Sequence, residues 1–473
     1  GVGFRGVRGA MRQVHEDRLR NLPRPFHHRR SEGDLLDGRV AEGCGTPGLR
    51  CGENGRRGHP GASRVDPQGD GGTAGIRQGE EGGIRVWCNG EGKDEYMKHV
   101  GSFKGKTMKD YKIPNLPLAI DIEDKAILKQ VSLAHRKLAE LKGIVHTIPN
   151  ESIIINTLTL QEAKDSSEVE NIVTTQDDLY RYELKVENFE ASPASKEVFR
   201  YREAIRTGFR LVRGNSLLTN NMIQQIQSVL VGNRAGFRKV PGTELRDNHG
   251  TVIYRPPQDG NDVLKYMGNL ETFINTRELT DLDPLVRLAV IHHQFESIHP
   301  FYDGNGRTGR IVCILFLIVN ELLDLPVLYL SRYITQNKQE YYRLIQAVRD
   351  SDGAVVDWRA WTFFLLKGIE QTAGHTILIV NGIKKLMDVF KQVLRPAFGV
   401  VYKHELLNHL FFHPYTKIEY MQRAMSVSRP TAAKYLDTIV KIGLLDKVKV
   451  GRSNYYVNQK LVDLFVNHAE ISI

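Results

Sequence analysis

The stretch of sequence with the clearest chemistry is HPFYDGNGRTGR, residues 299–310, which runs directly into the apolar segment IVCILFLIVNELL. Glycines on either side of Asn305 permit positive φ angles, so successive backbone N–H groups can point into one hollow. The helix expected to begin here adds unpaired N–H groups and the positive end of its dipole. These residues therefore predict a binding site for phosphate oxygens just before Ile311.

The charged side chains of this stretch suit the same ligand. Arg307 and Arg310 are three residues apart, so they share a face of the first helical turn, and their planar guanidinium groups match phosphate geometry. Asp303 can hold Mg²⁺ against the same phosphates, and His299 can take a proton from an incoming hydroxyl group. A single histidine, glycine turn or arginine pair is usually structural, and only their co-occurrence within twelve residues, with Phe301 as a buried anchor, favours a site.

The segment resembles the signature of the Fic family, H-x-F-x-[DE]-G-N-G-R-x-x-R, with every fixed position filled. The resemblance extends over about residues 120–390 and implies a mainly helical enzyme that moves AMP from ATP to a protein hydroxyl group. It implies that His299 is the general base and that Asp303 is the Mg²⁺ ligand. The ATP-binding residues that it implies in the signature are Phe301, Gly304, Asn305, Gly306, Arg307, Thr308, Gly309 and Arg310.

Two tyrosines further along the chain, Tyr341 and Tyr342 in EYYRLI, match aromatic residues of the family's adenine pocket. Their alternative role is that of core aromatics on a helix. Where some relatives carry an asparagine shortly afterwards, this chain has Arg349.

The upstream segment SSEVEN, residues 166–171, fits the [ST]-x-x-x-E-[GN] pattern of the Fic inhibitory helix, expected here at about residues 160–172. Ser166 and Glu170 are four residues apart and share a helix face, which in isolation is usually a solvated face. Asn171 completes the pattern. The resemblance implies that Glu170 pairs with Arg310 and blocks productive ATP binding, which predicts an autoinhibited enzyme. The same glutamate could orient a water that removes AMP, and the sequence does not separate the two directions.

A β-hairpin is predicted from the β-prone segments GFRKV (236–240) and VIYRPPQ (252–258), which flank a turn rich in Asn and Gly. The second segment resembles the family's flap, which docks a segment of the target protein by backbone pairing. The flap residues that the resemblance implies are Val252, Ile253 and Tyr254.

Helices are expected to support these segments. Apolar residues at three- and four-residue steps from Ile127 to Leu141 predict a helix that stops near Gly143. Asp283 and Pro284 predict the start of a helix that leads to His299. Residues 354–395 also read as helix. The expected fold is therefore mainly α, with an amino-terminal helical region at 97–230 and a catalytic core at 231–395.

Residues 396–473 predict a winged helix-turn-helix module. KIEYMQRAM and RPTAAKYLDTIVKIGLL read as its two helices, with Ser428 as a cap and Pro430 in the first turn, and DKVKVGRSNYYVN reads as a two-stranded wing. Such a module places its second helix in the major groove of DNA. Because its basic residues are few, an interaction or dimer module without DNA is the alternative.

Residues 1–96 differ from the rest, with 15 Arg, one Lys, 22 of the 43 glycines and three of the four cysteines. This composition predicts a disordered basic tail or a non-native extension ahead of Met97 or Met108. The chain lacks a C-x-x-C pair and an uninterrupted apolar span, since Glu321, Asp324 and Pro326 break the most apolar segment. We expect no disulfide framework, no membrane span and a cytoplasmic protein.

Two functions of different class follow. The first is an adenylyltransferase that uses ATP and Mg²⁺ on a protein substrate, which could include this chain itself. The second is a nucleic-acid-binding regulator whose Fic-like core only senses nucleotide. The intact His299 favours the enzyme, because a sensor does not need a base.

Overall fold

The structure is a computed structural model that describes residues 83–87, 95–98, 111–175, 178–179, 182, 192–246, 249–412, 414–450 and 453–467, the first two ranges as backbone only. These residues all belong to one of the two units into which the chain divides, and the other unit, residues 18–80, lies outside them. The predicted tail or extension at 1–96 lies outside the described residues except for two short strands, described below.

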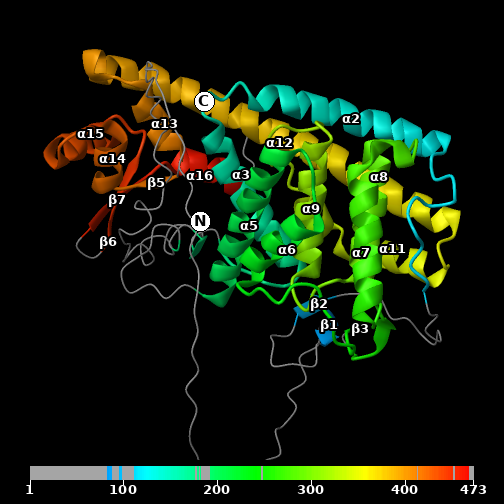
Figure 1. Cartoon of the computed structure of the whole chain (residues 1–473). Helices are drawn as coiled ribbons and strands as arrows, with labels where there is room; N and C mark the ends of the chain where they lie inside the picture. Colours follow the sequence, from blue (N-terminus) through cyan, green and yellow to red (C-terminus); the bar gives the residue numbers. More distant parts are fainter. Residues whose placement is uncertain are drawn as a thin grey trace, which may run out of the picture. The chain divides into compact units, whose positions relative to one another are not determined.

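Helices make up most of the described chain, as expected for a mainly α fold (Figure 1). Among the described residues, the 3₁₀ helices η2 (Arg277–Leu279) and η3 (Gly399–Val401) connect longer elements. The α-helices described up to the carboxy-terminal module include α2 (Lys125–Val145), α3 (Glu151–Val169), α5 (Pro193–Asn215), α6 (Asn220–Val231), α7 (Gly260–Asn275), α8 (Pro284–Ile298), α9 (Asn305–Val319), α10 (Ser331–Gln336), α11 (Lys338–Asp350) and α12 (Val355–Phe398).

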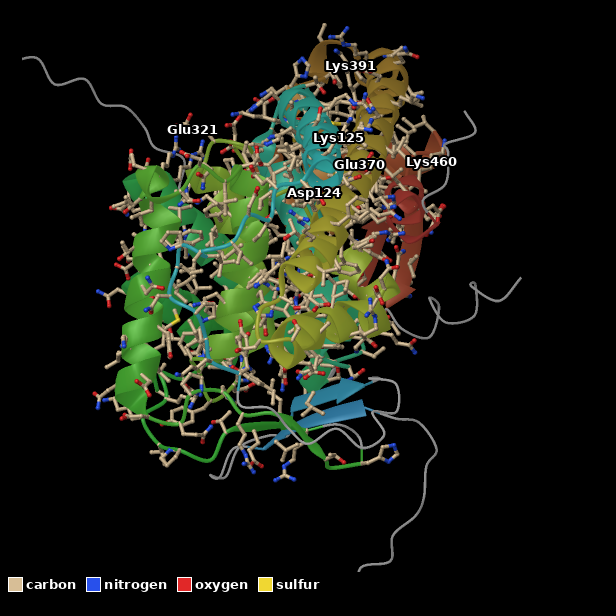
Figure 2. All side chains as sticks on the ribbon, turned by 90° about the vertical axis from the view of Figure 1, so that its right-hand side faces the viewer. Asp124, Lys125, Glu321, Glu370, Lys391 and Lys460 are labelled. Carbon is tan, nitrogen blue, oxygen red and sulfur yellow. The ribbon has the colours of Figure 1, made fainter. Side chains whose placement is uncertain are left out.

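Helix α2 lies alongside the long helix α12, with Lys125 labelled on the first and Glu370 on the second (Figures 1 and 2). The apolar stripe predicted for α2 is buried, and Asp124 caps its start by accepting from two backbone N–H groups. The predicted stop at Gly143 is wrong, because α2 continues to Val145. Burial of the Val145 side chain, which is 1% exposed, favours the last turn against the helix cost of glycine.

Helices α8 and α9 are packed together and are almost entirely buried. The predicted start of α8 is confirmed: Asp283 accepts from the Leu285 N–H, and Pro284 occupies the first turn. Helix α9 begins at Asn305, inside the glycine-rich turn. A polar turn is thus held between two buried helices, which fixes the position of residues 299–304.

A small antiparallel sheet has the strand order β2-β1-β3-β4, with β1 (Gly83–Trp87), β2 (Glu95–Lys98), β3 (Glu244–Arg246) and β4 (Val252–Tyr254). The second strand of the predicted hairpin is therefore right, and the first, residues 236–240, is wrong. That segment is fixed by side chains instead: Phe237 packs on Phe301 with ring centroids 5.1 Å apart, and Arg238 is buried. A strand there would point one of these two side chains away from the core.

The carboxy-terminal module contains α13 (His404–Phe412), α14 (Ile418–Met425), α15 (Arg429–Lys441) and α16 (Gln459–Asn467). Its sheet has the order β5-β7-β6, with β5 (Tyr415–Thr416), β6 (Asp446–Val450) and β7 (Ser453–Val457). The predicted two helices and wing are confirmed, and Ser428 caps α15 by accepting from the Thr431 N–H. Among the helices that the structure describes, none has the length and apolar character to span a membrane.

Candidate active site

His299 ends helix α8 in the left-handed region, with φ 48° and ψ 60°, and its side chain is 3% exposed. Neither ring nitrogen has a hydrogen-bond partner among the described residues. Burial lowers the pKa of His299 to about 3, helped by Arg238 and Arg349 and opposed by the Glu296 carbonyl group. The imidazole is therefore uncharged at neutral pH, and a ring nitrogen without a partner among the described residues can accept a hydrogen bond from a hydroxyl group.

The turn after His299 is locked by Asn305. Its side-chain amide donates to the Phe301 carbonyl and accepts from the Phe301 N–H, each at 2.8 Å, and both residues are buried. Gly304, with φ 77°, precedes α9 without a side-chain cap, so no side chain competes for the first N–H groups of the helix. The Thr308 hydroxyl is also buried without a partner among the described residues. The first turn of α9 can thus receive an anion.

Arg307, the first of the two arginines predicted to bind phosphate, is paired with two carboxylates. Arg307 is held by Glu197, with Nη1 to Oε2 at 3.0 Å, and lies 3.5 Å from an oxygen of Asp303. Asp303 is the more exposed partner, at 41% of its side chain. A single accessible carboxylate suits Mg²⁺ that is bound mainly through phosphates, as is usual for this ion. No cluster of three metal-ligating side chains occurs within the described ranges.

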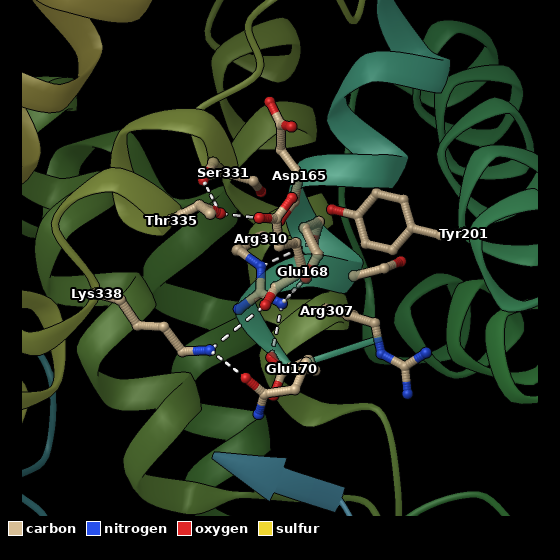
Figure 3. Close-up of polar contacts among 12 residues, drawn as sticks. Asp165, Glu168, Glu170, Tyr201, Arg307, Arg310, Ser331, Thr335 and Lys338 are labelled. Carbon is tan, nitrogen blue, oxygen red and sulfur yellow. Dashed lines mark hydrogen bonds and ion pairs between the residues drawn. The ribbon is translucent and has the colours of Figure 1, made fainter. Parts of the chain in front are cut away.

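Arg310 is 1% exposed and faces the end of helix α3 (Figure 3). Its Nε donates to Ser166 Oγ at 2.8 Å, and its Nη2 donates to the Ser166 carbonyl at 3.0 Å and to Glu170 Oε1 at 2.7 Å. Burial alone would lower the pKa of Arg310, but Glu170 and other groups raise it overall, so the cation persists. The sequence-predicted Ser166, Glu170 and Arg310 are brought together.

Glu170 also reaches the glycine-rich turn. A Cβ atom added to Gly306 would lie 2.5 Å from Glu170 Oε1, and one added to Gly309 would lie 2.6 Å from Glu296 Oε1. Only glycine fits at either position without movement of a carboxylate. The Glu170 carboxylate therefore lies directly against the first turn of α9, on the face that carries Arg310.

Two residues that the sequence analysis did not single out fix helix α3. Lys338, which begins α11, donates to Asn171 Oδ1 at 3.0 Å and to the Glu168 carbonyl at 3.4 Å (Figure 3). Glu162 is buried, accepts from the Tyr201 hydroxyl at 2.9 Å and also binds Ser331. Glu162 precedes Ser166 by one helical step of four, a spacing that could have indicated its place on the same face.

The two tyrosines of the predicted adenine pocket are buried. The Tyr341 hydroxyl lies 2.8 Å from His292 Nε2, inside the core between α8 and α11. Arg349 is turned toward the end of α8, where it donates to Ser297 Oγ and the Glu296 carbonyl, each at 3.1 Å. The structure thus places Tyr341 in the packed core that the alternative interpretation expected.

The predicted flap residues differ in burial. Val252 and Ile253 are half-buried, whereas Tyr254 is buried and its hydroxyl donates to the Ser297 carbonyl at 2.7 Å. The Arg349 guanidinium lies 4.0 Å from the centre of the Tyr254 ring. Strand β4 is therefore anchored to the end of α8 by a side chain, next to His299.

The fold is mainly helical and buries an uncharged histidine beside a glycine-rich helix start that can receive an anion. The chain belongs to the Fic/DOC family. It matches the Fic/DOC family N-terminal model at residues 128–210 and the Fic/DOC family model at residues 217–317. Residues 386–461 match the protein adenylyltransferase SoFic-like C-terminal domain.

Relatives include the protein adenylyltransferase Fic of Aedes aegypti, 28% identical over 145 residues, or 30% of this chain and 27% of the relative. The protein of the same name from Drosophila ananassae is 24% identical over 223 residues, or 46% of this chain and 38% of the relative. The chain thus spans well under half the length of these relatives. A solved Fic family protein from Desulfovibrio desulfuricans G20 aligns with a TM-score of 0.43 and 19% identity, over 72% of this chain and 97% of its own, which is too weak to carry a conclusion.

Proposed function

We propose that this chain is a protein adenylyltransferase that moves AMP from ATP to a Tyr, Ser or Thr hydroxyl group of a protein. The observation that carries the proposal is the buried, uncharged His299 beside the first turn of α9, which has no side-chain cap. Membership of the Fic/DOC family supports it, as do relatives that are named protein adenylyltransferases.

In the proposed reaction the target oxygen attacks the α-phosphorus of ATP, the bond to pyrophosphate breaks, and His299 accepts the hydroxyl proton. The N–H groups at Gly304, Asn305 and Gly306, together with the α9 dipole, hold phosphate oxygens. Mg²⁺ held by Asp303 would neutralise phosphate charge.

Other residues of the turn would support the nucleotide. Phe301 anchors the turn in the core, Thr308 offers its hydroxyl, and Gly309 leaves room for the Glu296 carboxylate. Arg307 and Arg310 would bind phosphates once their carboxylate partners give way. Tyr341 and Tyr342 stay predicted residues of the adenine pocket. Because both side chains are buried, they would support the wall of the pocket from within the core and would not present exposed rings to adenine.

We further infer that Glu170 inhibits the enzyme. Its carboxylate holds Arg310 and lies against Gly306, so it competes with a phosphate for the same guanidinium and the same turn. A buried guanidinium that is already neutralised by a carboxylate has less to gain from a phosphate. Inhibition would therefore end when α3 moves or when Glu170 is removed.

The first prediction concerns Glu170 and His299. Glu170→Gly should raise AMP transfer by about tenfold or more, because one charge-assisted hydrogen bond of roughly 1.5–3 kcal/mol no longer holds Arg310. Adding His299→Ala should abolish the gain. The measurement is transfer of labelled AMP from Mg-ATP, with mass spectrometry to locate the adduct on a target or on the chain itself.

Glu168→Gly is the matched control, since it places the same residue on the same helix but removes an exposed side chain that pairs only with Lys164 in the described contacts. Equal rates for the two glycine variants would contradict inhibition by Glu170. No AMP adduct with any variant would contradict the transferase. To test AMP removal, the adduct formed by the Glu170→Gly variant is isolated and incubated with the wild-type chain. Loss of label that requires Glu170 would show the reverse direction.

The remaining partner predictions rest on the sequence. Contact of the carboxy-terminal module with DNA stays a prediction, and two observations reduce its support: Arg429 pairs with Glu419, and Lys447 pairs with Asp437 at 2.7 Å. These pairs leave fewer cations for a phosphate backbone. A homodimer and a cytoplasmic location also stay predictions.

A further inference from the structure

The end of helix α8 is held by donors from outside the helix. The last carbonyl groups of any helix lack internal partners and carry the negative end of its dipole. Here five successive carbonyls are each satisfied, and the donors are Arg349 Nη2 to Glu296 at 3.1 Å, Tyr254 Oη to Ser297 at 2.7 Å, Arg238 Nη2 to Ile298 at 3.1 Å, Arg238 Nε to His299 at 2.7 Å and the Arg238 N–H to Pro300 at 2.9 Å.

Arg238 supplies three of these five donors, and its side chain is 1% exposed. It comes from the loop between α6 and β3, about sixty residues before the carbonyls that it binds. Its neighbour Phe237 packs on Phe301, so the loop contacts the chain on both sides of the residue pair His299–Pro300. This loop therefore holds the chain on both sides of His299.

The conformation that this loop holds is a costly one. His299 has a positive φ without being glycine, which costs roughly 1–2 kcal/mol and persists only where the surroundings impose it. The Arg238 guanidinium donates to the carbonyl group of Ile298, immediately before this residue, and to that of His299 itself. Without it, the backbone of His299 would lose both the hydrogen bonds and the positive charge that oppose its relaxation.

We propose that Arg238 is a positioning residue for His299, which fixes the left-handed backbone conformation from which the imidazole projects into the active site. This inference rests on the proposed transferase function. It assigns Arg238 no contact with ATP or with the target hydroxyl group.

A charge effect supports the same assignment. The imidazole is faced by two buried cations, Arg238 and Arg349, and by the Glu296 backbone carbonyl. After burial, the two cations are the next causes that lower the pKa of His299 to about 3. Arg238 thus holds the backbone of His299 and adds to the effect of burial in lowering the pKa of its imidazole.

The test uses the active Glu170→Gly chain as parent and adds Arg238→Lys. Lysine keeps the charge but cannot present the Nε and Nη2 donors of the fixed guanidinium fork. We expect kcat for AMP transfer to fall about 100-fold, as small misplacements of a reacting group do, with the ATP dissociation constant unchanged within about twofold. Arg234→Lys in the same loop, at an exposed position, is the control and should keep the parent's kcat.

A kcat within about twofold of the parent would overturn the proposal. So would an equal loss in kcat and ATP affinity, because that pattern indicates general damage to the fold. If Arg238→Lys unfolds, Arg238→Gln takes its place, because its side-chain amide can still donate but cannot reach both carbonyl groups as the guanidinium does. The ¹⁵N NMR signals of the His299 ring, assigned by their loss in His299→Ala, give a second readout: they should change when Arg238 is replaced, and unchanged signals would overturn the proposal.

Failure of the proposed function and failure of this inference can be told apart, because the NMR signal of His299 does not depend on AMP transfer. A parent that transfers no AMP, but whose His299 signal still changes when Arg238 is replaced, would contradict the proposed function alone.

Discussion

At the scale of single residues, Arg310 is the point where the two sequence motifs meet. Its guanidinium donates to the side chain and backbone of Ser166 and to Glu170, all within helix α3 or at its end. Serine and glutamate four residues apart lie on one face, so both reach the same cation. Ser166 therefore takes part in the proposed inhibitory contact as an acceptor.

Ser166→Ala should accordingly raise AMP transfer several-fold, but less than Glu170→Gly, because the Ser166 carbonyl and Glu170 still hold Arg310. Transfer of labelled AMP measures the effect. Ser167→Ala is a matched control, since that buried serine donates to Ala163 within its own helix. The same rise in both variants would show that α3 is merely loosened and would remove Ser166 from the inhibitory contact.

At the scale of elements, helix α3 is fixed at three levels along its length. Glu162 ties it to Tyr201 on α5 and Ser331 on α10, Ser166 and Glu170 tie it to α9, and Lys338 holds its end. Release of Glu170 by local fraying of the last turn needs fewer broken contacts than movement of the whole helix. Regulation is therefore expected at the Lys338 end of α3.

Burial raises the pKa of Glu162 from its ordinary 4.5 to about 7, although hydrogen bonds from Ser331 and Tyr201 oppose the shift. The folded chain then keeps a proton that the unfolded chain loses between these two values, so folding stability falls as pH rises from 4.5 to 7. Glu162→Gln mimics the protonated acid, and its amide can face the two hydroxyl groups, which accept as well as donate.

We expect the Glu162→Gln variant to match the wild type near pH 4.5 and to be more stable above pH 7 by up to roughly 3 kcal/mol. Urea unfolding at several pH values measures this difference. Glu168→Gln, an exposed change on the same helix, should leave the pH dependence as it is. A difference for Glu162→Gln that does not vary with pH would contradict the raised pKa.

At the scale of the whole described unit, one hydrophobic core runs from the amino-terminal helices into the carboxy-terminal module. Phe390 of α12 and Phe411 of α13 meet across the junction, with ring centroids 5.1 Å apart. Contacts of α13 with both α12 and α3 join the module to the helix that carries Glu170. The module is therefore part of the same cooperative structure rather than a tethered domain.

Phe411→Ala should lower the stability of the whole unit by about 3–5 kcal/mol, the usual cost of emptying a buried phenylalanine site. Scanning calorimetry should show one transition, shifted to lower temperature. Phe363→Ala, at a side chain that is 39% exposed, should shift it little. Two separate transitions, of which only one moves, would show that the module folds independently.

Features that depend on neighbouring residues could be predicted from the sequence. The caps at Asp283 and Ser428 were right, as was the helix start in the glycine-rich turn, because each is set by side chains within about four residues. The family resemblance also predicted the pairing of Glu170 with Arg310, which are 140 residues apart in the chain. The conformational preferences of the separate segments could not have predicted this contact.

Tertiary structure alone decided what lies around these motifs. Residues 236–240 have a strand-like composition, yet Phe237 and Arg238 are drawn onto the turn after α8. The roles of Arg238, Glu162 and Lys338 likewise depend on partners 39 to 170 residues away. A chain's local pattern reports the conformations that each segment favours, whereas the partner of a buried charge is set by which segments the packed core brings together.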